Sequence, residues 1–196
     1  MLKRLSYTTV MLAAGIAPAF AHLDPVEHGS FAAGFSHPFF GLDHILAMVA
    51  VGLWAALLGG RSAWLVPTAF VGTMMVGFVV ALAGLGLPFV EPVIAASVVV
   101  IGLLTLVALQ VPAPVGMAMV GFFAFFHGYA HGGELGDAGA LSFCAGFAVA
   151  TAILHAAGVG LGLGMGRLVG GPLGRTFTRA AGALTALGGL WIAIGN

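Results

Sequence analysis

Two groups of histidines and carboxylates stand out in the chain, and the first is His37-Pro-Phe-Phe-Gly-Leu-Asp43-His44. Pro38 suits the first position of a helix. We therefore expect His37 at the mouth of that helix, with Asp43 and His44 about 1.5 turns inside it. An ionised Asp in hydrocarbon is costly unless it is paired or solvated. The spacing indicates a bound cation or a polar cavity; the alternative is a polar contact between packed helices.

The second group is His127-Gly-Tyr-Ala-His131-Gly-Gly-Glu134. His127 and His131 are four residues apart, so they share one face of a helix. Glu134 continues that face if the helix survives Gly132-Gly133; otherwise it lies on a flexible cap above His131. Either geometry suits nitrogen and oxygen ligation of a divalent cation. The alternative is an outer loop with incidental histidines.

Three further residues are candidate ligands. Glu91 is the only carboxylate of its loop, where it completes coordination, guides a cation or is a plain loop acid. His155 lies deep in a later apolar run and either relays a cation inward or hydrogen-bonds within the bundle. His22 follows a predicted cleavage site, where its imidazole and the free amine could chelate a metal unless the terminus is disordered. The predicted metal ligands are His37, Asp43, His44, Glu91, His127, His131 and Glu134, with His22 and His155 as additional candidates.

The composition restricts the elements that can position these residues. Hydrophobic residues make up 61% of the 196 and charged residues only 6%, against about 25% charged in a typical soluble domain. Six Lys and Arg cannot form a basic footprint for nucleic acid. The 32 glycines favour close packing of membrane helices. The single Cys144 excludes an internal disulfide and a cysteine-based metal cluster.

The N-terminal residues have the pattern of a secretory signal peptide. Lys3 and Arg4 precede an apolar stretch at 5–17, and Ala19-Phe-Ala21 is an A-x-A cleavage site. The alternative is an uncleaved first helix. We therefore predict a signal peptide at 1–21 and a single membrane domain at 22–196.

Apolar runs predict an all-α bundle of six transmembrane helices, since a span needs about 20 apolar residues. The alternation typical of membrane strands is absent. The predicted spans are 38–59, 63–86, 92–110, 114–131, 138–164 and 178–195.

The charges orient this bundle. After cleavage the remaining basic residues are Arg61, Arg167, Arg175 and Arg179, all in predicted loops on one side of the membrane. The positive-inside rule makes that side cytoplasmic. The carboxylates fall in the opposite half, beside most of the histidines. We therefore expect a multi-pass protein of a bacterial inner membrane, with its mature N-terminus in the periplasm.

Four segments resemble the motifs of the HupE/UreJ family of membrane proteins. They are HPFFGLDH at 37–44, AMVAVGLWA at 47–55, FHGYAHGGE at 126–134 and ATAILHAAG at 150–158. The resemblance implies a nickel or cobalt permease with a cleaved signal peptide and six spans, linked to hydrogenase or urease maturation. It also implies functional positions at His37, Asp43, His44, Glu91, His131 and Glu134.

The function that we predict is transport of Ni²⁺, or of Co²⁺, from the periplasm into the cytoplasm. Imidazole suits nickel, and carboxylates offset its charge. We expect no enzymatic activity, no prosthetic group and no nucleic-acid partner; association with further copies of the chain is left open. The alternatives are an intramembrane zinc-dependent hydrolase, although the chain has no H-E-x-x-H, and a haem electron carrier with paired histidines.

Overall fold

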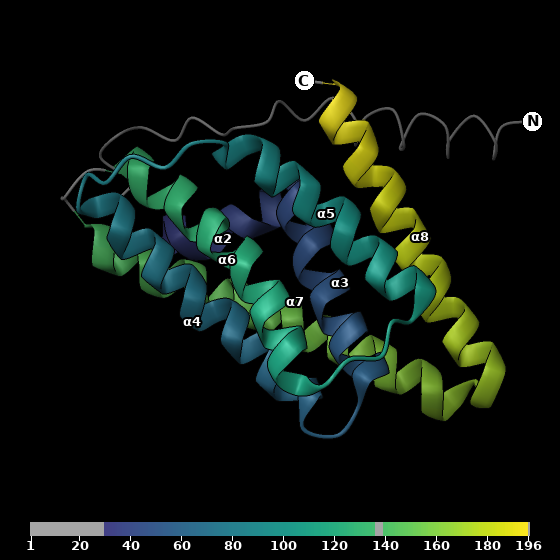
Figure 1. Ribbon diagram of the computed structural model, residues 1–196. Helices are drawn as coiled ribbons and strands as arrows, with labels where there is room; N and C mark the ends of the chain where they lie inside the picture. Colours follow the sequence, from purple (N-terminus) through teal and green to yellow (C-terminus); the bar gives the residue numbers. More distant parts are fainter. Residues whose placement is uncertain (1–29, 136–138, 196) are drawn as a thin grey trace, which may run out of the picture.

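The structure, a computed structural model, describes residues 30–135 and 139–195, and all regular structure in these ranges is helical. The predicted signal peptide and His22 lie outside the described residues. The helices, shown in Figure 1, are α2 (Phe31–Phe40), α3 (Leu42–Leu58), α4 (Ser62–Leu82), α5 (Val90–Val107), α6 (Ala113–Leu135), α7 (Ala140–Leu168) and α8 (Gly171–Gly195).

The described helices are those of a multi-pass membrane protein. Each helix from α4 to α8 is long and apolar enough to cross a membrane. α2 and α3 meet the same criterion only together, and they are bent by 83° at the break between them. With this bent pair counted as one span, the described part of the chain has up to six spans, in agreement with the predicted number.

The bend corrects our prediction for the first span. The helix does not begin at Pro38, because α2 already begins at Phe31, where the Ser30 hydroxyl accepts a hydrogen bond of 2.9 Å from the Ala33 amide. Pro38 lies inside α2. The break comes at Gly41, whose extended backbone (φ −89°, ψ 116°) caps both helices. His37 therefore lies on a separate short helix, set at an angle to the helix of His44.

The last loop is also shorter than predicted. α7 continues to Leu168 and α8 begins at Gly171, so Arg167, Arg175 and Arg179 lie within helices. Arginine has a high helix propensity, and its long side chain can carry its charge out of the apolar layer. The arginines predicted in the last loop are therefore carried by α7 and α8.

Glycines let the helices pack in close pairs. α4 packs on α6, α5 on α8, and both α2 and α3 on α7. A Cβ added to Gly77 would collide with the Phe125 carbonyl, and one added to Gly128 would collide with the Met74 carbonyl, so α4 and α6 touch backbone to backbone. Gly102 and Gly182 have the same role where α5 crosses α8. The glycine content thus serves close helix contacts, as expected for a membrane bundle.

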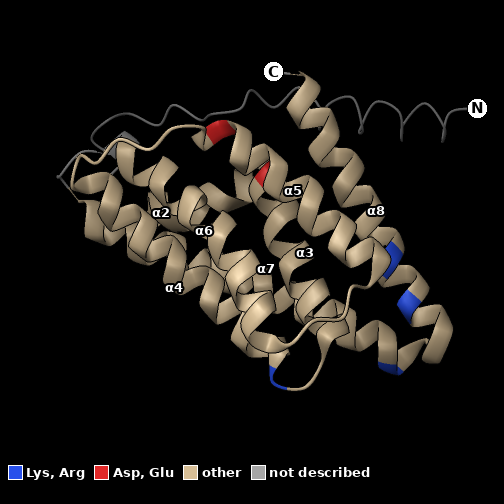
Figure 2. Cartoon of the chain, in the orientation of Figure 1, with Lys and Arg blue, Asp and Glu red and all other residues tan. Residues whose placement is uncertain are grey.

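The described charges separate to the two ends of the bundle, as Figure 2 shows. Arg61 lies in the turn between α3 and α4, and the other arginines lie around the turn between α7 and α8. We call this the arginine end. The N-terminal turns of α3 and α5, which carry Asp43 and Glu91, lie at the opposite end, called here the acidic end.

Candidate metal-binding site

Three histidines from three helices meet near the acidic end. His37 comes from α2, His44 from α3 and His131 from α6. One ring nitrogen from each lies within 4.8 Å of those of the other two. Two nitrogens that bind one ion at about 2.1 Å lie about 3–4 Å apart. Small side-chain rotations would therefore let this trio, His37, His44 and His131, bind a single divalent cation.

The bend between α2 and α3 brings His37 into the trio. α2 turns back toward α7 instead of extending the axis of α3. The His37 ring consequently lies 5.4 Å from the His44 ring and 4.5 Å from the His131 ring, measured between centroids. A straight helix beginning at Pro38 would place His37 at the helix mouth, about two turns away from His44.

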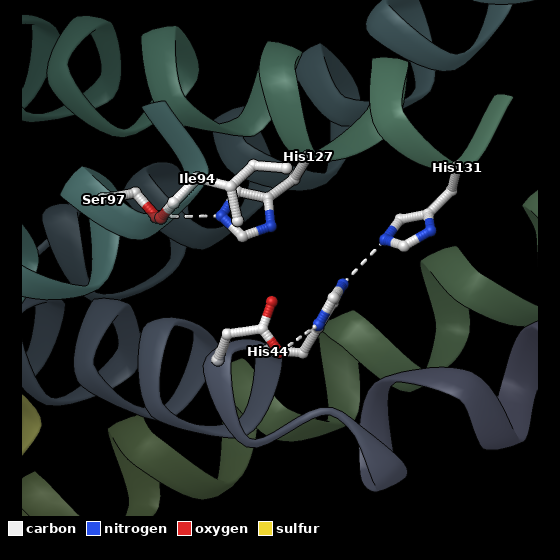
Figure 3. Close-up of polar contacts among 6 residues, drawn as sticks. His44, Ile94, Ser97, His127 and His131 are labelled. Atoms are coloured by element: carbon white, nitrogen blue, oxygen red, sulfur yellow. Dashed lines mark hydrogen bonds and ion pairs between the residues drawn. The ribbon is translucent and has the colours of Figure 1, made fainter. Parts of the chain in front are cut away.

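His44 is held at both ring nitrogens. Its Nδ1 lies 2.9 Å from Asp43 Oδ1, and its Nε2 lies 2.7 Å from His131 Nε2 (Figure 3). Because the carboxylate can only accept, Nδ1–H of His44 donates to Asp43. Nε2 of His44 then carries a lone pair, which accepts from His131 Nε2–H in this structure and could bind a metal in place of that hydrogen bond. A carboxylate behind a metal-binding imidazole is a common arrangement, which fixes the tautomer and orients the ring.

Gly41 leaves the space that this pair needs. A Cβ at position 41 would lie 2.6 Å from His44 Nδ1 and 2.9 Å from Asp43 Oδ1. Both distances are shorter than real Cβ atoms show. The glycine in the HPFFGLDH motif therefore keeps clear the hydrogen bond between Asp43 and His44.

His127 lies beside the trio, one turn before His131 on α6. Its ring is fully buried and its centroid is 5.5 Å from that of His44. The Ser97 hydroxyl donates to the Ile94 carbonyl at 2.6 Å and lies 2.9 Å from His127 Nε2, so its oxygen accepts from Nε2–H. The Nδ1 lone pair of His127 is thus left without a partner among the described residues. Figure 3 shows His127 between Ser97 and His44.

Ser97 and Phe147 contribute to the site, and sequence reasoning did not identify either residue. Ser97 is one of only two hydroxyl residues in the apolar sequence of α5, the other being Thr105, and this was an available signal. Phe147 of α7 lies 4.7 Å from the His131 ring and 5.9 Å from the rings of both His37 and His44. Phe147 forms an apolar wall of the trio, which strengthens the electrostatic interactions there by excluding water.

An open cavity of about 690 Å³ at the acidic end adjoins this site at Asp43. It lies among α3, α5 and α8, and its lining includes Asp43, Glu91 and Trp191. Asp43 therefore contacts both the cavity and His44, whereas Glu91 is exposed at the start of α5. The two carboxylates give the cavity a negative charge that attracts cations.

The other predicted ligands are placed differently. α6 runs through Gly132-Gly133 to Leu135, so Glu134 lies on a continuous helix one turn beyond His131; its side chain lies outside the described part of the structure. His155 is fully buried in α7, and its ring packs 4.8 Å from Phe70 instead of joining the trio. Neither of its nitrogens has a hydrogen-bond partner in residues 30–135 and 139–195, so the predicted hydrogen bond within the bundle is not found there.

Comparison with known proteins gives two full-length matches. A family model described as "HupE / UreJ protein" matches residues 9–192 of the chain. "Protein HupE" of Rhizobium leguminosarum bv. viciae is 44% identical over 194 residues, which are 98% of this chain and 100% of that protein. No solved structure matches. The matches confirm the resemblance that the motifs indicated.

Proposed function

Because the chain belongs to the HupE/UreJ family, we propose that it carries Ni²⁺, or alternatively Co²⁺, through the membrane from the acidic end to the arginine end. The family is associated with nickel and cobalt uptake for hydrogenase or urease. The observation that carries the proposal is the trio: three imidazoles from three helices, with ligand nitrogens within 4.8 Å of one another. Imidazole is a preferred ligand of nickel, whereas magnesium and calcium prefer oxygen.

The order of the side chains supports a path for the ion. A cation would first meet Glu91 and Asp43 in the cavity and then the imidazole of His44, to which Asp43 is hydrogen-bonded. Each imidazole would replace part of the hydration shell, while the carboxylates would offset the charge of the ion. Phe147 would keep bulk water from competing for the ion at the trio.

The charge distribution supports import. Arginines concentrate at cytoplasmic membrane surfaces, so the arginine end would face the cytoplasm and the cavity would face the periplasm. In this orientation the mature N-terminus is periplasmic, and the imported ion supplies hydrogenase or urease maturation. The zinc-dependent hydrolase has no support from the family, and we do not pursue it.

Uptake by the purified protein tests the proposal. Proteoliposomes that enclose a metal-sensitive dye should take up Ni²⁺ or Co²⁺, with zinc and copper as competitors. His44→Ala and Glu134→Ala should abolish accumulation while the protein still inserts into the membrane. Phe122→Ala is a matched control, because Phe122 lies on α6 with its side chain about half exposed on the outside of the bundle.

Two results would contradict the proposal. One is wild-type protein that inserts correctly but takes up no nickel or cobalt. The other is normal uptake by both His44→Ala and Glu134→Ala. Orientation is tested separately by labelling a cysteine placed at the arginine end, which an impermeant reagent should reach only from the cytoplasmic side.

A further inference from the structure

His155 is a buried polar side chain whose environment nothing in the fold explains. Its imidazole is fully buried, and both ring nitrogens lack a hydrogen-bond partner among the residues that the structure describes. A buried polar group without a partner destabilises a protein, so such a group in a native fold calls for a function. In either neutral tautomer one of the two nitrogens has a lone pair that can bind a cation.

This imidazole follows the trio along the membrane axis, toward the arginine end. The Phe70 ring lies between the two regions, with its centroid 5.8 Å from that of His127 and 4.8 Å from that of His155. Thr151 lies one turn before His155 on the same face of α7. The Thr151 hydroxyl is buried, 3.7 Å from the Met74 sulfur. Nitrogen and oxygen atoms that could bind a cation therefore extend from His127, past the Phe70 ring, to Thr151 and His155.

His155 also lines a groove that reaches the arginine end. The groove has a volume of about 640 Å³ and lies between α4 and α7. It begins at Ala63 and Trp64, next to Arg61 in the turn that precedes α4, and extends to Gly72 and His155 near the middle of the bundle. The groove thus opens on the side opposite to the cavity of Asp43 and Glu91, and the fully buried His155 side chain lies behind its inner wall.

We propose that His155 is a second binding station for the transported cation, which receives the ion from the region of His127 and releases it into the groove between α4 and α7. This inference rests on the proposed transport function and adds to it an inner site and an exit. Two stations on opposite sides of Phe70 divide the path into short steps, so that no single site has to bind the ion too tightly to release it.

The variant His155→Leu separates this role from a structural one. Leucine fills much of the same volume, and the buried nitrogens that it removes make no hydrogen bond to any residue that the structure describes. The protein should therefore insert normally, with an unchanged or raised melting temperature. Nickel binding at the trio, measured at equilibrium in detergent, should be unchanged, whereas uptake into proteoliposomes should fall about tenfold or more.

The outcomes distinguish the two proposals. Wild-type vesicles without uptake would contradict the transport function itself. Uptake by wild type together with equal uptake by a stable His155→Leu would overturn only the second station. His131→Ala is the matched comparison, because it should lose binding and uptake together, whereas His155→Leu should lose uptake alone.

A second measurement applies even if His155→Leu does not fold. Ala156 is an exposed residue that lines the groove, and Cys144 is the only native cysteine. In a Cys144→Ala background that retains uptake, Ala156→Cys should react with an impermeant thiol reagent added at the arginine end, and the reaction should block uptake. A thiol that the reagent cannot reach from that end, or one fully modified without loss of uptake, would overturn the proposal.

Discussion

His44 and His131 of the trio and His155 are all buried in the same bundle, but His44 and His155 are held in opposite ways. His44 is fixed at both nitrogens, by Asp43 and by His131, and the neighbouring His127 is fixed by Ser97. Among residues 30–135 and 139–195, His155 has ring packing against Phe70 and no hydrogen bond. Fixed imidazoles present their lone pairs in defined directions, which favours selection of an ion. An imidazole without hydrogen bonds can reorient at little cost, which favours brief binding and release.

The largest expected effect comes from removing ligands of the trio. His44→Ala and His131→Ala should each lower nickel affinity about a hundredfold or more, because each removes one nitrogen from a shared ion. The double variant should lose little more than either single variant, since residues that act as one unit are strongly non-additive. Isothermal titration of the four proteins measures this coupling.

If the loss of nickel affinity in the double variant equalled the product of the two single-variant losses, His44 and His131 would not share one ion. Independent ligands on separate ions would give additive free energies of binding. Phe122→Ala should bind nickel like the wild type, which excludes a general effect of changing α6.

Gly41→Ala should have the next largest effect. The added methyl group would meet His44 Nδ1 and Asp43 Oδ1, so it must displace the hydrogen bond that orients His44. Loss of such a supporting contact lowers metal affinity about ten- to a hundredfold. Affinity measured by titration checks this; Gly72→Ala is the control, because a Cβ there meets no atom within 4 Å. Wild-type affinity in Gly41→Ala would show that the orientation of His44 does not matter.

Ser97→Ala should act on stability more than on binding. It leaves Nε2–H of the buried His127 without its acceptor, which costs about 1–3 kcal/mol of folding free energy. Thermal unfolding in detergent should show a lower melting temperature for Ser97→Ala than for the wild type. His155→Leu should show no decrease in melting temperature. Equal destabilisation of both variants would remove the distinction between fixed and unfixed imidazoles.

Glu91→Gln should have the smallest effect. The carboxylate is exposed at the cavity, so it attracts ions at long range. The initial uptake rate should fall about two- to fivefold at low ionic strength, and the difference should disappear in high salt, where exposed charges are screened. A loss of uptake that high salt does not reduce would instead indicate that Glu91 binds the ion directly.

Local sequence was sufficient for the features that depend on periodicity and charge. It predicted an all-α membrane fold, the common face of His127 and His131, and the separation of carboxylates from arginines. It did not predict the break at Gly41. α2 is too short to read as a span, and its position depends on contacts with α7, where Gly34 touches the backbone of Phe143. The hydrogen bond between Ser97 and His127 also joins residues far apart in the chain.

The glycine contacts determine which parts of the molecule can move. α4 and α6 touch backbone to backbone at Gly77 and Gly128, and α5 and α8 do so at Gly102 and Gly182. Tightly packed contacts of this kind resist continuous deformation. A conformational cycle would therefore displace whole helix pairs against one another. His131 belongs to the first pair and Ser97 to the second, while His44 lies on α3, which packs on α7. The trio thus lies where these helix pairs meet, so small shear displacements between the pairs would alter the distances between its ring nitrogens.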